Sequence, residues 1–163
     1  MTSSIDFYHV SLKLFLKNEK GEILVMQTLI EGNGQGKYDV PGGRIDEDEF
    51  NVPFEQIIRR EVAEELGDTI TSDILPDPVA LGRKKFPFAQ KDASILFVFF
   101  EGMYRGGEIK ICEEYSGFDW IDPTNPEYAD RFIPGIYDAL QHYLARGHCE
   151  PHTLLSEKKL PKA

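Results

Sequence analysis

Three glutamates, Glu61, Glu64 and Glu65, stand close together in the segment with the strongest helical pattern. Side chains three or four positions apart lie on the same side of a helix, so these carboxylates neighbour one another. On a helical wheel at about 100° per residue, Glu61 and Glu65 continue the stripe that Phe54 and Ile58 begin, and Glu64 flanks it. The acids therefore occupy positions where core residues are expected.

The place of these acids within the helix is unfavourable without a counter-charge. They cluster near the predicted C-terminus, which Gly67 marks, and the helix dipole disfavours negative charge there. Like charges at this spacing also repel one another. A solvated acidic helix end is the simpler interpretation, but the acids do not lie on the polar face. The pattern therefore predicts a site for an oxygen-preferring divalent cation such as Mg²⁺.

A longer pattern surrounds the glutamates: GGRIDEDE begins at Gly42, and RREVAEELG begins at Arg59. This pattern resembles the Nudix box of the Nudix hydrolases, in which a glycine and a glutamate precede an Arg-Glu pair, a Glu-Glu pair and a final glycine. A motif of this length is more specific than a short one. The box positions are occupied here by Gly43, Glu49, Arg60, Glu61, Val62, Glu64, Glu65 and Gly67.

The sequence departs from the box in two places. Ten residues separate Glu49 from Arg60, which is three more than the family pattern has. We interpret the extra residues as an insertion around Asn51–Pro53, in the loop before the helix, which leaves the helix acids in register. The usual supporting role of Glu49 is then open to question. Asp68 occupies the final, usually aliphatic position and affects only the helix exit.

The resemblance implies roles for individual groups. Metal ligands are expected from the backbone carbonyl of Gly43 and from Glu61, Glu64 and Glu65. Glycine at position 43 would let the loop approach the ion closely. Glu64 has two interpretations: it binds a second ion, or it holds the helix to a neighbouring loop.

The same resemblance points to catalytic residues. Glu64, in the box, and Glu114, in a later loop, are the candidates for the general base, and Glu114 stands six residues before Trp120, where the family often has a glutamate. The alternative for Glu114 is an ordinary loop acid beside Glu113. We expect Arg60 to pair with a carboxylate and fix its orientation; the alternative is a solvated arginine.

These roles imply hydrolysis of the phosphoanhydride bond in a nucleoside diphosphate linked to another group X, with Mg²⁺ or Mn²⁺ as cofactor. The expected substrates are small molecules, either nucleoside triphosphates or NDP-sugars. The alternative function is a Nudix-fold nucleotide-binding module without catalysis, which the intact glutamates disfavour. A structural Ca²⁺-binding protein is disfavoured as well, because the acids have helical spacing rather than that of an EF-hand loop.

The elements that must position these residues follow from periodicity and turn residues. Alternation over Tyr8–Phe15, a turn at Asn18–Gly21 and an apolar run at Ile23–Met26 predict a hairpin. The apolar run within Ser94–Phe100 predicts a central strand. The other predicted elements are strands at Tyr38–Val40, Pro78–Leu81, Glu108–Ile111 and Phe118–Ile121, and helices at Pro53–Leu66 and Pro134–Arg146. Strands interrupted by helices suggest a mixed sheet, and the resemblance implies an α+β fold, an α/β/α sandwich with a central mixed sheet.

Length and composition suit one domain. We expect a single Nudix domain over residues 1–146 and a polar tail over residues 147–163. The net charge of −10, without a dense basic patch, argues against nucleic acid as a partner. No apolar run reaches the roughly 18 residues of a membrane span, and the N-terminus lacks a signal-peptide pattern. The two cysteines form no metal-binding pair. We expect a cytoplasmic protein, either a monomer or a homodimer.

Overall fold

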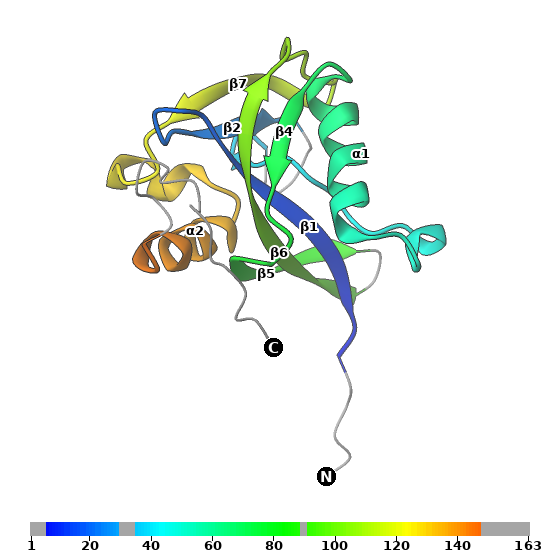
Figure 1. The fold of residues 1–163 in the computed structure, drawn as a ribbon. Coiled ribbons are helices and arrows are strands. Elements are labelled where there is room, and N and C mark those ends of the chain that lie inside the picture. Colours follow the sequence, from blue (N-terminus) through cyan, green and yellow to red (C-terminus); the bar gives the residue numbers. More distant parts are fainter. Residues whose placement is uncertain (1–5, 30–34, 89–90, 148–163) are drawn as a thin grey trace, which may run out of the picture.

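A mixed β-sheet lies between two helices in the computed structural model, which describes residues 6–29, 35–88 and 91–147. Helix α1 (Phe54–Leu66) lies on one side of the sheet and α2 (Ile136–Ala145) on the other (Figure 1). This arrangement confirms the predicted α+β sandwich. None of the helices in these ranges is long and apolar enough to cross a membrane.

The sheet has seven strands in the order β3-β2-β1-β6-β4, with β5 on β6 and β7 on β2. Strands β1 and β6 run parallel, and the other pairs are antiparallel, so the sheet is mixed as predicted. The predicted hairpin is present as β1 and β2. The strands are β1 (Tyr8–Lys17), β2 (Ile23–Thr28), β3 (Tyr38–Asp39), β4 (Thr71–Ile74), β5 (Ala80–Phe88), β6 (Lys91–Gly106) and β7 (Tyr115–Ile121).

Strand β1 is covered on both faces. Its Leu12, Leu14 and Leu16 pack in the cluster beneath α1, whereas Phe15 packs in the cluster beneath α2. Lys13 alternates with the leucines and is also buried, at 5% exposure. Three polar residues of the strand, Ser11, Lys13 and Lys17, therefore lie inside the protein, because two helix layers replace the solvent that a one-sided sheet would face.

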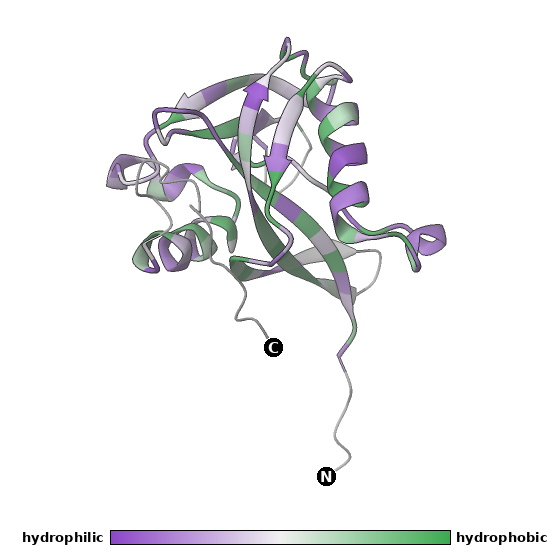
Figure 2. Ribbon diagram, in the orientation of Figure 1, coloured by the Kyte–Doolittle hydropathy of each residue, from purple (hydrophilic) through white to green (hydrophobic). Residues whose placement is uncertain are grey.

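Strand β6 is central, as its apolar sequence predicts, since it pairs with β1, β4 and β5. Figure 2 shows hydrophobic residues along much of β6, whereas the short helix η1 (Glu47–Glu49) is hydrophilic. Strands β5 and β6 are both longer than predicted, and β7 begins earlier than predicted, at Tyr115. Strand β5 pairs along its whole length with the first part of β6, and β4 pairs with the last part, so pairing extends both β5 and β6 beyond their apolar stretches.

The ends of α1 follow its breakers closely. Pro53 is the N-cap rather than the predicted first helical residue. Gly67 ends the helix with φ of 99°, a conformation that favours glycine. Val52 packs against the α1-side cluster, and the Pro53 carbonyl accepts hydrogen bonds from the amides of Gln56 and Ile57. Residues 52 and 53 therefore contribute to packing and to the start of α1.

One predicted strand is wrong and one strand was missed. Residues 108–111 form no strand; instead the amide of Lys110 donates to the carbonyl of Leu66 at 2.8 Å, at the end of α1. Helix C-termini leave carbonyls without partners, and this segment satisfies one of them. The missed strand, β4, is mostly polar, so it carries little apolar signal. The predicted helix 134–146 is confirmed as α2, and residues 148–163 of the predicted tail lie outside the described ranges.

Candidate active site

Helix α1 carries two of its glutamates toward the protein interior. Glu65 is buried at 7% exposure, and the side chain of Glu61 is 12% exposed. The side chain of Glu64 is 59% exposed, so it flanks the stripe as the helical wheel predicts. The prediction that Phe54 belongs to the buried stripe is wrong, because it is 49% exposed. As the first residue of α1, it lies at the edge of the packed face.

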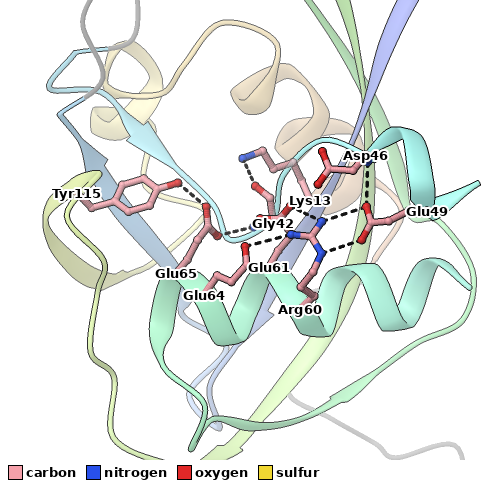
Figure 3. Close-up of polar contacts among 9 residues, drawn as sticks. All are labelled: Lys13, Gly42, Asp46, Glu49, Arg60, Glu61, Glu64, Glu65 and Tyr115. Carbon is pink, nitrogen blue, oxygen red and sulfur yellow. Dashed lines mark hydrogen bonds and ion pairs between the residues drawn. The ribbon is translucent and has the colours of Figure 1, made fainter. Parts of the chain in front are cut away.

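Both carboxylate oxygens of Glu65 accept a hydrogen bond (Figure 3). The amide of Gly42 donates to Oε2 at 2.7 Å, and the hydroxyl of Tyr115 donates to Oε1 at 2.6 Å. Burial raises the pKa of Glu65 to about 7, although the charge of Lys13 and both hydrogen bonds favour the carboxylate. Glu65 is thus a fixed, desolvated carboxylate next to the glycine loop.

Two glycines bring the loop against these acids. A Cβ at Gly43 would lie 2.4 Å from Oε1 of Glu61, so no side chain fits there without displacing that carboxylate. A Cβ at Gly42 would lie 2.1 Å from the carbonyl oxygen of Leu12, and its φ is +120°. The Gly43 carbonyl accepts the Leu12 amide at 2.8 Å. Gly43 therefore lies directly against the Glu61 carboxylate.

A buried lysine holds the same loop from β1. The Nζ of Lys13 donates to the carbonyl of Gly42 at 2.6 Å and to that of Val40 at 3.3 Å. It also forms an ion pair with Oδ2 of Asp39 at 2.9 Å. Burial alone would lower the pKa of Lys13, but attraction to Asp39 and Glu65 outweighs burial and raises it. Lys13 therefore stays positively charged beneath the loop.

Arg60 contacts three carboxylates at once (Figure 3). It donates to both oxygens of Glu49, at 2.7 and 3.1 Å, and contacts Glu61 at 2.9 Å and Glu64 at 3.0 Å. The hydrogen bond from Arg60 lowers the pKa of Glu49. Burial raises the pKa of Glu61, although Arg60 opposes this. Despite the extra residues in the preceding loop, Glu49 still reaches the arginine.

The loop glutamate lies next to a residue of the site rather than in its interior. Glu114 is exposed, and its carbonyl accepts the amide of Leu29 at 2.7 Å. Its neighbour Tyr115 holds Glu65. The structure thus brings Gly43, Glu61, Glu65 and Arg60 together. Glu64 lies at the surface beside Arg60. Glu114 is related to the site as the residue that precedes Tyr115.

The donor set suits an oxygen-preferring divalent cation. Glu61 and Glu65 lie against consecutive residues of one glycine loop, whose carbonyls add neutral oxygen donors. Within the described ranges no three side chains of His, Cys, Asp or Glu converge as a preformed metal cage.

Sequence reasoning missed four contributors: Lys13, Asp39, Gly42 and Tyr115. Lys13 was visible only as a polar residue in an alternating strand, where solvent is the ordinary expectation. Tyr115 contacts Glu65 across 50 positions of sequence, a separation at which local patterns carry no signal.

Comparison with known proteins identifies the family. The NUDIX domain model matches residues 7–143 of the chain. Nucleoside triphosphatase NudI of Escherichia coli K12 is 25% identical over 125 residues, covering 71% of this chain and 82% of that protein. The chain belongs to the Nudix family, and it is a hydrolase of that family.

Solved structures share the fold. The MutT protein of Methanosarcina mazei superposes with a TM-score of 0.70 at 23% identity, covering 89% of this chain and 99% of that one. The NUDIX domain of Shewanella oneidensis NrtR, solved in complex with ADP ribose, gives a TM-score of 0.60 at 17% identity, covering 88% and 90%. At these identities the likeness concerns the fold.

Proposed function

We propose that the chain hydrolyses the phosphoanhydride bond of a nucleoside diphosphate linked to X in a reaction that requires Mg²⁺ or Mn²⁺. The observation that carries this proposal is the inward position of Glu61 and Glu65 against the Gly42–Gly43 loop. Two buried acids on the packed face of a helix are costly in a protein without a cation partner. The acidic net charge of −10 adds a further need for a cation when an anionic phosphate approaches.

The proposed ligands are Glu61, Glu65 and the carbonyl of Gly43, with Glu64 available at the rim. When bound, the cation would neutralise diphosphate oxygens and polarise the attacking water. The protein prepares this site by fixing both oxygens of Glu65 before any ligand arrives. Such preorganisation avoids rearrangement during the reaction.

Arg60 positions the acids of the site. Its planar guanidinium donates two hydrogen bonds to Glu49 and also forms ion pairs with Glu61 and Glu64. The base that removes the proton from water is Glu64 or Glu114, because both are exposed carboxylates at the edge of the site. Arg60 beside Glu64 would keep that carboxylate turned toward the helix.

Nucleoside triphosphates are the first substrate class to test. The similarity to a nucleoside triphosphatase favours them, because NudI shares the family and aligns over most of both chains. NDP-sugars are the second class. The alternative, a nucleotide-binding module without catalysis, is favoured less because all three glutamates of the box are present. Arg60 contacts Glu61 and Glu64, and the glycine loop contacts Glu61 and Glu65.

The test separates and identifies the products of nucleoside triphosphates, their oxidised forms and NDP-sugars, each with Mg²⁺, with Mn²⁺ and with EDTA. Triphosphates should release phosphate or pyrophosphate, whereas an NDP-sugar should give a nucleoside monophosphate and a sugar phosphate. We expect turnover with either metal and none in EDTA. Glu65→Gln should lose this turnover, and Glu55→Gln is its matched control. Glu55 lies on the same helix but is exposed, and in the described part of the chain it pairs with Arg59. Full activity in EDTA contradicts the mechanism, and tight nucleotide binding without release across the panel favours the binding module.

A further inference from the structure

The segment before β7 is fastened to the end of α1 that carries the glutamates. The amide of Lys110 donates to the carbonyl of Leu66 at 2.8 Å, and the amide of Cys112 donates to the carbonyl of Glu65 at 3.0 Å. These bonds use carbonyls that a helix C-terminus leaves without partners. The last turn of α1 and residues 110–115 therefore form one connected unit.

Tyr115 closes this unit through a side chain. It is 5% exposed, and its hydroxyl donates to Oε1 of Glu65 at 2.6 Å. From the other side the amide of Gly42 holds Oε2. Figure 3 shows Tyr115 and Gly42 reaching the Glu65 carboxylate from different elements. Because each oxygen has its own donor, the rotation of the carboxylate is fixed.

The hydroxyl is a dependable donor. Tyrosine ordinarily keeps its phenolic proton at neutral pH, and the 2.6 Å contact directs this proton to Oε1 of Glu65. A hydrogen bond to a carboxylate is shorter and stronger than one between neutral groups. A carboxylate that has accepted one bond on each oxygen still has lone pairs for a cation.

We propose that Tyr115 is a positioning residue that acts through Glu65, holding its carboxylate in the orientation that binds the divalent cation. This inference rests on the proposed function, which makes Glu65 a metal ligand. A tyrosine present only for packing would be replaced by phenylalanine without consequence for metal binding. Groups that orient a metal ligand typically change metal affinity about 10- to 100-fold when removed.

The experiment measures Mn²⁺ binding by the loss of the free Mn²⁺ signal in electron paramagnetic resonance, with no substrate present. We expect Tyr115→Phe to bind Mn²⁺ about 10- to 100-fold more weakly than wild type, and Glu65→Gln to bind more weakly still. We also expect excess Mn²⁺ to restore the turnover of Tyr115→Phe, but not that of Glu65→Gln. A packing role would leave binding unchanged and show only in thermal melts in EDTA.

Tyr104→Phe is the matched control, because it also removes a tyrosine hydroxyl, one that donates to the carbonyl of Gly107 rather than to a glutamate of α1. Its Mn²⁺ affinity should equal that of wild type. If Tyr115→Phe does not fold, Tyr115→Leu, which also lacks the hydroxyl, is tested in its place and should show the same loss.

The outcomes separate this inference from the function beneath it. If Tyr115→Phe binds Mn²⁺ as wild type does while Glu65→Gln does not bind it, the positioning role is wrong and the metal assignment stands. If Glu65→Gln also binds as wild type does, Glu65 is not a ligand, and both the assignment and the inference fail. Weakened binding in both variants, with Tyr104→Phe unaffected, supports the positioning role.

Discussion

Helices α1 and α2 cover opposite faces of the same sheet (Figure 1), yet the side chains that they bury differ in polarity. The buried residues of α2 are all hydrophobic: Ile136, Ala139, Leu140 and Tyr143. The buried residues of α1 are four apolar ones, Ile57, Ile58, Val62 and Leu66, together with Glu65, and Glu61 is almost as enclosed. The two helices therefore differ in that α1 buries acids and α2 does not.

The comparison separates stability from function. Burying a carboxylate opposes its ionisation, and the pKa of Glu65, raised to about 7 by burial, records that cost. Lys13, Gly42 and Tyr115 offset the cost only in part. Proteins tolerate such local inconsistencies at functional sites and rarely elsewhere. The α2 face shows what this sheet packs against when packing is the sole requirement.

The largest expected effect comes from neutralising the buried acid. We expect Glu65→Gln to lower turnover roughly 100- to 1000-fold, because the electrostatic contribution of a metal amounts to several kcal/mol and about 1.4 kcal/mol corresponds to a tenfold change in rate. In EDTA its stability should be unchanged or raised by roughly 0.5–2 kcal/mol, as is usual where function costs stability. Thermal melts in EDTA and in Mg²⁺ measure this.

The same melts test the opposite explanation. Mg²⁺ should raise the melting temperature of the wild type, because it binds the folded state, and the rise should shrink in Glu65→Gln. A glutamate that only holds the helix in place through Lys13 predicts a lower melting temperature for the variant in EDTA. That result, with an unchanged response to Mg²⁺, would make Glu65 structural.

The second prediction concerns the truncation of a buried side chain on α2. Leu140 is fully buried beneath the sheet, so Leu140→Ala should lower the free energy of unfolding by roughly 2–5 kcal/mol. Turnover per folded molecule should not change, because Leu140 packs in the cluster beneath α2, on the face of the sheet opposite to α1. Denaturant unfolding and assays at a temperature where the variant is folded measure the two quantities. A large loss of turnover in fully folded Leu140→Ala would contradict the view that the α2 face contributes to stability and not to function.

Local patterns predicted most of this comparison. The 3.6-residue period placed Glu61 and Glu65 on the inward face, and Gly67 marked the end of α1. Periodicity failed where tertiary contacts decide the outcome. Phe54 follows the wheel but lies at the helix edge, and residues 108–111 donate to a helix end instead of joining the sheet.

The polar contacts of the site could not be predicted from the sequence. Lys13 and Asp39 form an ion pair across 26 positions, and Tyr115 reaches Glu65 across 50. Such contacts depend on how the sheet orders β1, β3 and β7, which no single segment encodes. The family pattern identified the acids and the glycine loop, because those residues are close in sequence; their supporting residues are close only in the fold.

The smallest expected effect concerns the contact between the loop and the helix. A Cβ at Gly43 would overlap the Glu61 carboxylate, at 2.4 Å from its Oε1, so Gly43→Ala should turn Glu61 away. The fold should tolerate this, since an off-rotamer side chain costs about 0.5–1.5 kcal/mol. We expect turnover to fall roughly tenfold, which corresponds to about 1.4 kcal/mol of transition-state stabilisation. Steady-state kinetics and denaturant unfolding of the same variant measure the two effects.

Gly117→Ala in β7 is the matched control, because a Cβ there meets nothing within 4 Å, and it should match wild type in both measurements. The contact itself is tested by a double-mutant cycle with Glu61→Asp, whose shorter side chain leaves room for the added methyl group. If displacement of Glu61 causes the loss, adding Gly43→Ala to Glu61→Asp should cost much less than tenfold, so that the two changes are non-additive. Strict additivity would mean that the methyl group acts elsewhere, and that the place of Glu61 against the loop does not matter for turnover.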